Sequence, residues 1–190
     1  MVAMSSSEQL TTYGPSALAT PANAITLVRI GLAPVLVMIL ISAPDSLLPA
    51  WMWAGLAFTD GADGYIARRQ GVTRSGAFLD PLADKLLVFS VFAALWFLHR
   101  VSGMPVLIMG VRELLVSAYR TQVLASGRSL PARIPGKLKM VVQIVVIGMA
   151  LIPAVATHDA ELINVAAWIA TVLAVVSGIQ YFTDSRSIKA

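Results

Sequence analysis

The sequence has no cysteine and little charge. With no Cys among its 190 residues, disulfide bonds, a thiolate nucleophile and cysteine-ligated metal centres are excluded. Charged residues make up only 13% of the chain, whereas a soluble domain carries roughly 25%. Hydrophobic residues make up 57%, and the mean hydropathy is +0.79. This composition places the chain in the membrane class.

Basic residues are missing from the first part of the chain. No Lys or Arg precedes Arg29, so the sequence lacks the basic region that opens a secretory signal peptide. We expect residues 1–20 to form a mobile or interfacial tail. The net charge of +4 favours basic loops facing anionic lipid headgroups over nucleic-acid binding, because the chain is otherwise so apolar.

Apolar segments long enough to cross a bilayer recur along the chain. A helical span needs about 20 mostly apolar residues. The segments that qualify are Ala24–Ala43, Leu48–Arg68, Ala77–Leu98, Met104–Ala125, Leu138–Ala156 and Leu162–Phe182. They predict an all-α polytopic membrane protein of six transmembrane helices, with one domain over residues 21–183 and a short tail over residues 184–190.

The placement of Lys and Arg predicts how these helices are oriented. One set of connections and the C-terminal tail carry nearly all of the basic residues: Arg68, Arg69, Arg74, Arg128, Arg133, Lys137, Arg186 and Lys189. The opposite set of connections carries only Arg100. By the positive-inside rule, both termini are cytoplasmic, and the protein lies in the cell (inner, cytoplasmic) membrane.

Four of the ten acidic residues lie within residues 60–84: Asp60, Asp63, Asp80 and Asp84. Spacings of three and four residues put each pair on one helical face. Asp60 and Asp84 both lie about 12 Å inside their predicted helix ends. If the second and third helices are neighbours, the four carboxylates converge on one cavity that faces the cytoplasm.

Four ionised carboxylates at membrane depth are costly, so either several of them are protonated or cations compensate them. Oxygen ligands without Cys or His favour a hard divalent ion, Mg²⁺, Mn²⁺ or Ca²⁺, and two such ions would balance four carboxylates. The alternative is a set of helix-end acids paired with neighbouring cations, namely Arg68, Arg69, Arg74 and Lys85. The small residues Gly61, Gly64 and Ala67 permit close approach of a ligand or close packing of helices.

The spacing of these residues resembles a known signature. Asp60-x2-Asp63-Gly64-x2-Ala67-Arg68 followed by Gly76-x3-Asp80-x3-Asp84 is similar to that of the CDP-alcohol phosphatidyltransferases. The stretch between Arg68 and Gly76 is one residue shorter than the family usually has. This difference shortens a loop and leaves both helical halves of the signature intact.

The resemblance extends over most of residues 20–182. Pro21-Ala22-Asn23-Ala24-Ile25-Thr26-x2-Arg29 resembles the start of the family's first helix. Arg112-Glu113-x3-Ser117-x2-Arg120 and Gly136-Lys137-Leu138-Lys139-x3-Gln143 resemble the branch that makes phosphatidylglycerophosphate. That branch often has Thr where this chain has Met140.

The resemblance implies a role for each matching residue. Asp60, Asp63 and Asp80 would hold two divalent ions, Mg²⁺ or Mn²⁺, with Asp84 joining them or acting as the base. The pocket for CDP-diacylglycerol would be formed by Asn23, Thr26, Gly64, Ala67, Arg68 and Gly76. Asp84 would take the proton of an acceptor hydroxyl, and CMP would leave. The resemblance also implies a homodimer.

Cations outside the signature bear on the acceptor. Arg112, Arg120, Lys137 and Lys139 suit an acceptor that carries phosphate, such as glycerol 3-phosphate. Alternatively, the cations near the helix ends only set topology. Arg112 and Glu113 are neighbours in sequence and do not face each other, so we expect each to have a partner on another helix. His99 and His158 fall on the opposite side and receive no role.

Other functions stay open at this point. The same chemistry could use inositol phosphate, serine or phosphatidylglycerol as acceptor. A cation transporter belongs to a different class, but its path would need polar residues on several helices and across the whole membrane. Here the acids stop about halfway across. A structural scaffold would not need four matched acids.

Overall fold

The computed structural model describes the backbone of residues 21–70, 76–125 and 134–187, and the side chains of residues 26–59, 83–119, 121–122 and 138–183. Within these ranges all regular secondary structure is helical, which confirms the all-α prediction. The helices are α1 (Pro21–Ser42), α2 (Leu48–Gln70), α3 (Gly76–Phe97), α4 (Gly103–Ala125), α5 (Ile134–Leu151), α6 (Pro153–His158) and α7 (Ala160–Ser187).

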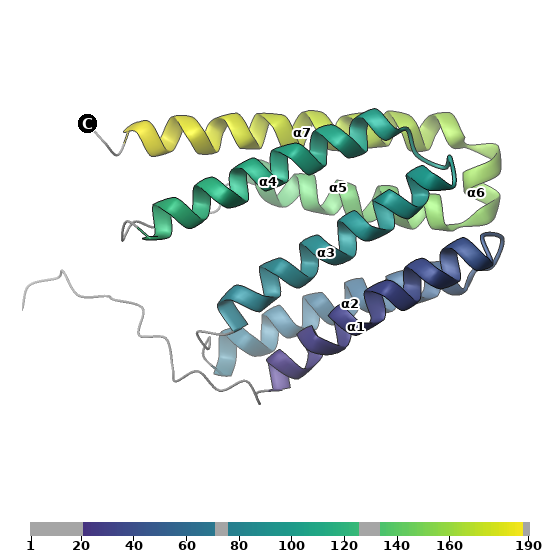
Figure 1. The fold of residues 1–190 in the computed structure, drawn as a ribbon, viewed down its shortest axis with the longest axis horizontal. Coiled ribbons are helices and arrows are strands. Elements are labelled where there is room, and N and C mark those ends of the chain that lie inside the picture. Colours follow the sequence, from purple (N-terminus) through teal and green to yellow (C-terminus); the bar gives the residue numbers. More distant parts are fainter. Residues whose placement is uncertain (1–20, 71–75, 126–133, 188–190) are drawn as a thin grey trace, which may run out of the picture.

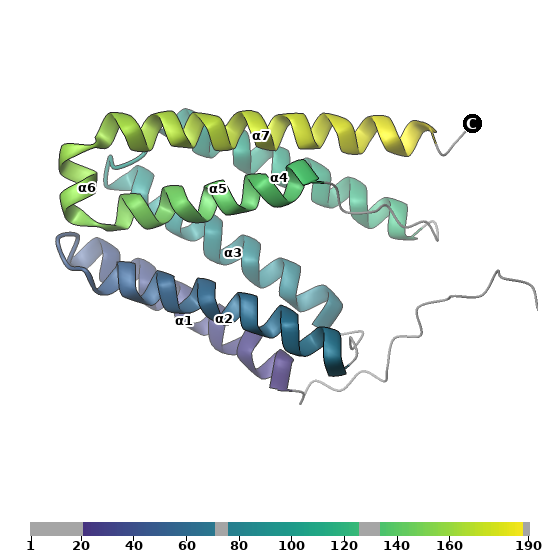
Figure 2. The same ribbon diagram turned by 180° about the vertical axis from the view of Figure 1, so that it is seen from behind.

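The long helices run roughly along one axis and form two groups (Figures 1 and 2). One group contains α1, α2 and α3, and the other contains α4, α5 and α7. Helix α3 packs against α1 and also contacts α4 and α5. Side chains on α3 can therefore reach both groups.

The two ends of the bundle differ in which helix termini they hold (Figure 1). At one end, here called the closed end, lie the α1–α2 turn, the α3–α4 turn and the short helix α6. At the other, here called the open end, lie the starts of α1, α3 and α5 and the ends of α2, α4 and α7. Both halves of the predicted signature thus belong to helix segments at the open end. Which side of a membrane this end faces remains a prediction.

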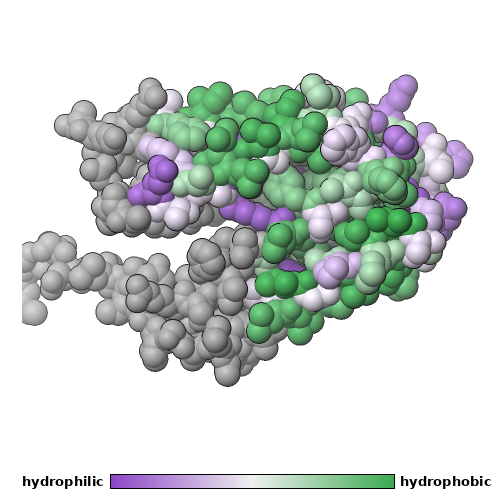
Figure 3. All heavy atoms as spheres, viewed as in Figure 1, coloured by the Kyte–Doolittle hydropathy of each residue, from purple (hydrophilic) through white to green (hydrophobic). Residues whose placement is uncertain are grey.

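Apolar residues fill the core and also cover much of the outside. Leu36, Phe92 and Ile147 are fully buried between helices, whereas Trp51 and Phe58 are largely exposed. Figure 3 shows hydrophobic residues spread over the visible face of both helix groups. Such a surface is suited to lipid contact rather than to water.

One helix of the described part is both long and apolar enough to cross a membrane, over Ala160–Thr183. Shorter apolar helical stretches cover Thr26–Ser42 and Leu138–Leu151. The six-span topology therefore remains a prediction.

The predicted fifth span, Leu138–Ala156, is wrong as a single helix. Helix α5 ends at Leu151, and Pro153 begins the separate helix α6. Ile152 between them is extended, with φ −84° and ψ 115°. Proline disfavours helical backbone in the residue before it, and its missing N–H is tolerated at the start of a helix. Pro153 was the sequence signal for this break.

Arg100 links several elements at the closed end. Its Nη1 donates to the carbonyl of Ala150 at the end of α5 (3.1 Å), and its Nη2 donates to the carbonyl of Pro44 in the α1–α2 turn (2.6 Å). Its contact with Asp45 is longer, at 3.8 Å, and the Asp45 side chain is 90% exposed. The hydrogen bonds to the two carbonyl oxygens therefore tie Arg100 to α5 and to the α1–α2 turn more firmly than the contact with Asp45 does.

We expect Arg100→Met to lower the apparent unfolding temperature of the purified protein in detergent. Hydrogen bonds from a charged donor contribute about 1.5–3 kcal/mol each, and methionine makes neither. Asp45→Asn is the control, since an exposed ion pair contributes about 1 kcal/mol at most, and should leave the temperature nearly unchanged. Equal unfolding temperatures for Arg100→Met and the unmodified protein would contradict the linking role.

Candidate functional site

Asp84 on α3 forms an ion pair with Arg29 on α1. The Arg29 Nη1 lies 3.0 Å from the Asp84 Oδ1. The side chain of Arg29 is only 3% exposed and that of Asp84 is 24% exposed. Thr26, one helical turn before Arg29, is also buried and shares its face of α1. The start of α1 and the second half of the signature therefore meet in the structure.

Most other residues of the predicted site have side chains outside the described part. Asn23 belongs to α1, Asp60, Asp63, Gly64, Ala67 and Arg68 to α2, Gly76 and Asp80 to α3, Arg120 to α4, and Lys137 to α5. Among the side chains that are described, no group of three or more His, Cys, Asp or Glu could hold a metal ion. Asp84 is the one predicted metal ligand in that set, so convergence of the four carboxylates remains a prediction.

Three cations from three helices surround the carboxylate of Glu113 on α4. Lys139 of α5 contacts its Oε2, Arg112 of α4 lies 2.8 Å from the same oxygen through Nη1, and the Nζ of Lys85 on α3 lies 3.7 Å from Oε1. We call these four residues the Glu113 cluster. Sequence analysis placed Arg112 and Lys139 together at an acceptor site, and the structure brings them together.

Helix α7 also contributes to this cluster. The Arg112 Nη2 donates to the hydroxyl of Ser177 at 2.7 Å. Next to Ser177, Gly178 lets α7 approach closely, because a Cβ there would lie 3.0 Å from the Arg112 Nε. The Arg112 guanidinium therefore has one partner on its own helix, Glu113, and one on α7, Ser177.

The expectation that Arg112 and Glu113 do not face each other is wrong. Their Cβ atoms leave the helix in different directions, but both side chains are long and curl toward each other, which allows the 2.8 Å contact. The related expectation of partners on other helices is confirmed. Arg112 contacts Ser177 on α7, and Glu113 contacts Lys139 on α5.

The Glu113 cluster carries more positive than negative charge. Its three cations and one carboxylate leave a surplus of two positive charges among the described residues. The side chains of Arg112 and Lys139 are only 12% and 11% exposed. Burying uncompensated charge is costly, so this arrangement is suited to a ligand that brings negative charge.

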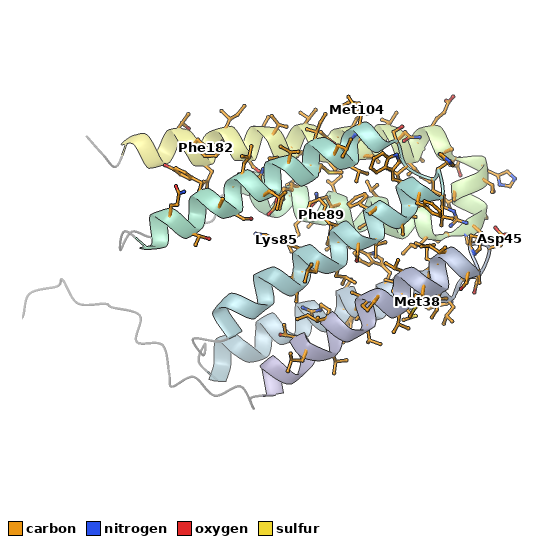
Figure 4. The ribbon with its side chains drawn as sticks, in the orientation of Figure 1. Met38, Asp45, Lys85, Phe89, Met104 and Phe182 are labelled. Carbon is orange, nitrogen blue, oxygen red and sulfur yellow. The ribbon has the colours of Figure 1, made fainter. Side chains whose placement is uncertain are left out.

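Sequence reasoning missed Lys85 and Glu113 as members of one cluster. Lys85 was weighed only as a possible partner of the signature acids, yet its Nζ contacts the hydroxyl of Ser117 on α4 and faces Glu113. Figure 4 shows Lys85 on the part of α3 that faces α4. Successive helical residues point about 100° apart. Asp84 therefore turns toward α1, whereas Lys85 turns toward α4 and α5.

The two arrangements share one level of the bundle. Figure 3 shows hydrophilic residues gathered between the two helix groups, toward the open end. Both the Asp84–Arg29 pair and the Glu113 cluster involve α3, through adjacent residues. Helix α3 therefore contributes to both arrangements, through Asp84 and Lys85.

Known proteins are similar to this chain in both sequence and fold. The family model described as CDP-alcohol phosphatidyltransferase matches residues 19–179. A probable phosphatidylglycerophosphate synthase of Mycobacterium tuberculosis is 35% identical over 175 residues, covering 88% of this chain and 82% of the relative. A CDP-diacylglycerol–glycerol-3-phosphate 3-phosphatidyltransferase of Bacillus subtilis is 34% identical, covering 86% and 93% of the two chains.

Among solved structures, the phosphatidylinositol phosphate synthase of Mycobacterium tuberculosis has a similar fold. Its apo form gives a TM-score of 0.65 at 22% identity, covering 87% of this chain and 89% of that one. The form with CDP-DAG bound gives a TM-score of 0.62, also at 22% identity, with coverage of 87% and 86%. The extent of the family match and the identity to these relatives lead to one conclusion: the chain belongs to the CDP-alcohol phosphatidyltransferase family.

Proposed function

We propose that this chain transfers the phosphatidyl group of CDP-diacylglycerol to a hydroxyl of glycerol 3-phosphate, forming phosphatidylglycerophosphate and releasing CMP. The printed names of its relatives in Mycobacterium tuberculosis and Bacillus subtilis support this acceptor. The structural observation that carries the proposal is that α3 contributes consecutive residues to two polar arrangements: Asp84 pairs with Arg29, and Lys85 faces Glu113. On this proposal, Asp84 takes the proton of the acceptor and the cations around Glu113 hold its phosphate.

The proposal includes a location in the membrane. The exposed apolar side chains and the six apolar segments favour a polytopic protein of the cytoplasmic (inner) membrane, with six spans and both termini in the cytoplasm. The open end would then face the cytoplasm at the level of the lipid headgroups, where a lipid diphosphate lies. The homodimer implied by the family resemblance belongs to the same proposal.

CDP-alcohol phosphatidyltransferases use divalent metal ions, and the donor set of this chain suits them. Asp60, Asp63, Asp80 and Asp84 would hold two ions, Mg²⁺ or Mn²⁺, through carboxylate oxygens, which are the ligands that such ions prefer. Ions held there would supply charge neutralisation for the diphosphate and for the leaving group. Asp84 is partly exposed and already balanced by Arg29, so its carboxylate is held in place independently of a metal.

The remaining chemistry belongs to the side chains of the protein. Asp84 accepts the proton of the acceptor hydroxyl, whose oxygen forms a bond to the phosphorus that bears the diacylglycerol. The bond from that phosphorus to the bridging oxygen breaks, and CMP leaves with the electron pair. Arg112 and Lys139, with Arg120 and Lys137, bind the phosphate of the acceptor. Asn23, Thr26, Gly64, Ala67, Arg68 and Gly76 form the pocket for CDP-diacylglycerol.

We expect Asp84→Asn to lower CMP release by at least about a hundredfold, because loss of a general base typically costs 10²–10⁴ in rate. The measurement is CMP formed from CDP-diacylglycerol and glycerol 3-phosphate by purified protein. Asp45→Asn makes the same chemical change on an exposed residue of the closed end and should keep full activity. Undiminished CMP release from Asp84→Asn would rule out the assigned base.

Removal of divalent ions should abolish CMP release. Excess EDTA is expected to stop the reaction, and added Mg²⁺ or Mn²⁺ to restore it, because the diphosphate charge is then neutralised again. The unfolding temperature of the protein in EDTA serves as the control for folding. Full activity after exhaustive chelation would contradict a metal-dependent site.

A panel of candidate acceptors tests which alcohol the protein uses. Purified protein with CDP-diacylglycerol and Mg²⁺ is offered glycerol 3-phosphate, inositol phosphate, serine and phosphatidylglycerol separately, and the lipid product is identified by mass spectrometry. We expect phosphatidylglycerophosphate from glycerol 3-phosphate and little product otherwise: serine offers the Glu113 cluster no phosphate, and the names of the relatives favour glycerol 3-phosphate over inositol phosphate and phosphatidylglycerol. Product only with one of the other acceptors would keep the chemistry and overturn the acceptor.

A further inference from the structure

Among the three cations of the Glu113 cluster, Lys85 has the least compensated charge. Glu113 presents Oε2 to both Lys139 and Arg112, whereas the Lys85 Nζ lies 3.7 Å from Oε1, beyond hydrogen-bond distance. The side chain of Lys85 is also 36% exposed, about three times as much as that of either other cation. Its ammonium group is therefore the one most accessible to an incoming anion.

Ser117 holds this ammonium without neutralising it. The Ser117 hydroxyl donates its proton to the backbone carbonyl of Glu113 and accepts a hydrogen bond from the Lys85 Nζ. An ammonium has three N–H donors, and one of them goes to Ser117. The others can bind oxygens of a ligand, and the neutral hydroxyl leaves the full positive charge in place.

Lys85 also occupies the position that joins the two halves of the site. It directly follows Asp84, which faces Arg29 on α1, while Lys85 itself faces α4. An acceptor whose hydroxyl lies at Asp84 and whose phosphate lies at the Glu113 cluster would therefore contact this turn of α3.

We propose that Lys85 is a further acceptor-binding residue, which holds the phosphate of the acceptor together with Arg112 and Lys139, and that Ser117 positions its ammonium group. The inference rests on the proposed function, since it assigns a residue to the acceptor side of the same site. It adds an acceptor-binding residue from α3, the helix that carries the proposed base. Acceptor binding and proton removal thereby become linked through one helical turn.

The test compares Lys85→Met with the unmodified protein in steady-state assays of CMP release. We expect the KM for glycerol 3-phosphate to rise about tenfold to hundredfold, as the loss of one charge-assisted hydrogen bond predicts, while the KM for CDP-diacylglycerol stays unchanged. Lys85→Arg keeps the charge and should recover part of the affinity. Lys189→Met removes one positive charge from the C-terminal tail and should change neither constant.

Ser117→Ala provides a second, milder variant. It keeps the Lys85 charge but removes the group that positions it, so the KM for glycerol 3-phosphate should rise by a smaller factor in the same direction. If Lys85→Met does not fold, Ser117→Ala decides the question alone, and an unchanged KM for glycerol 3-phosphate in that variant overturns the proposal.

The outcomes separate this inference from the proposed function. If the unmodified protein releases no CMP with glycerol 3-phosphate, the proposed function fails. If it does release CMP and Lys85→Met keeps the same KM for glycerol 3-phosphate, only the role of Lys85 fails. Equal rises in both KM values together with a lower unfolding temperature would make Lys85 a structural residue and would also overturn the proposal.

Discussion

The carboxylate of Glu113 contacts cations from α3, α4 and α5, so these three helices meet around one largely buried acid. Arg112 and Lys139 are largely buried, and without Glu113 their charges would repel each other in a medium that screens poorly. A buried ion pair is weak evidence for stability, because apolar side chains would often pack as well. A cluster with surplus positive charge is therefore better explained by a ligand than by the needs of folding.

Apolar and polar side chains of α3 occupy different parts of the bundle. Toward the closed end, Phe92 and Leu95 of α3 are fully buried in an apolar core, and Arg100 holds the α1–α2 turn against the end of α5. Toward the open end, the same helix carries Asp84 and Lys85, whose partners are ionic or polar. A rigid apolar half can position reactive side chains while the polar half remains accessible to ligands. Helix α3 runs through both the apolar half and the polar half.

Composition and spacing predicted much of this protein, but they could not predict which side chains meet. The apolar segments predicted most helix bounds within a few residues, since span length is a physical requirement of the bilayer. The break before Pro153 was missed because hydropathy continues across it. Helical periodicity gives the face of a residue but not its neighbours, so the contact of Lys85 with Ser117 needed the packing of α3 on α4. The functional prediction came from the family signature, since charge and depth alone left transport and enzymatic chemistry open.

The apolar core at the closed end helps to decide between transport and enzymatic chemistry. A transport path would need polar groups on both sides of the bundle, yet among the described side chains the polar clusters of the interior lie toward the open end. Beyond them, Leu36, Leu40 and Ile147 are fully buried, and Arg100 is engaged by carbonyls rather than by acids. Among the described residues an apolar core therefore separates these polar clusters from the closed end, which counts against a transport path. On the proposed function, CDP-diacylglycerol and the acceptor would enter, and CMP would leave, at the open end.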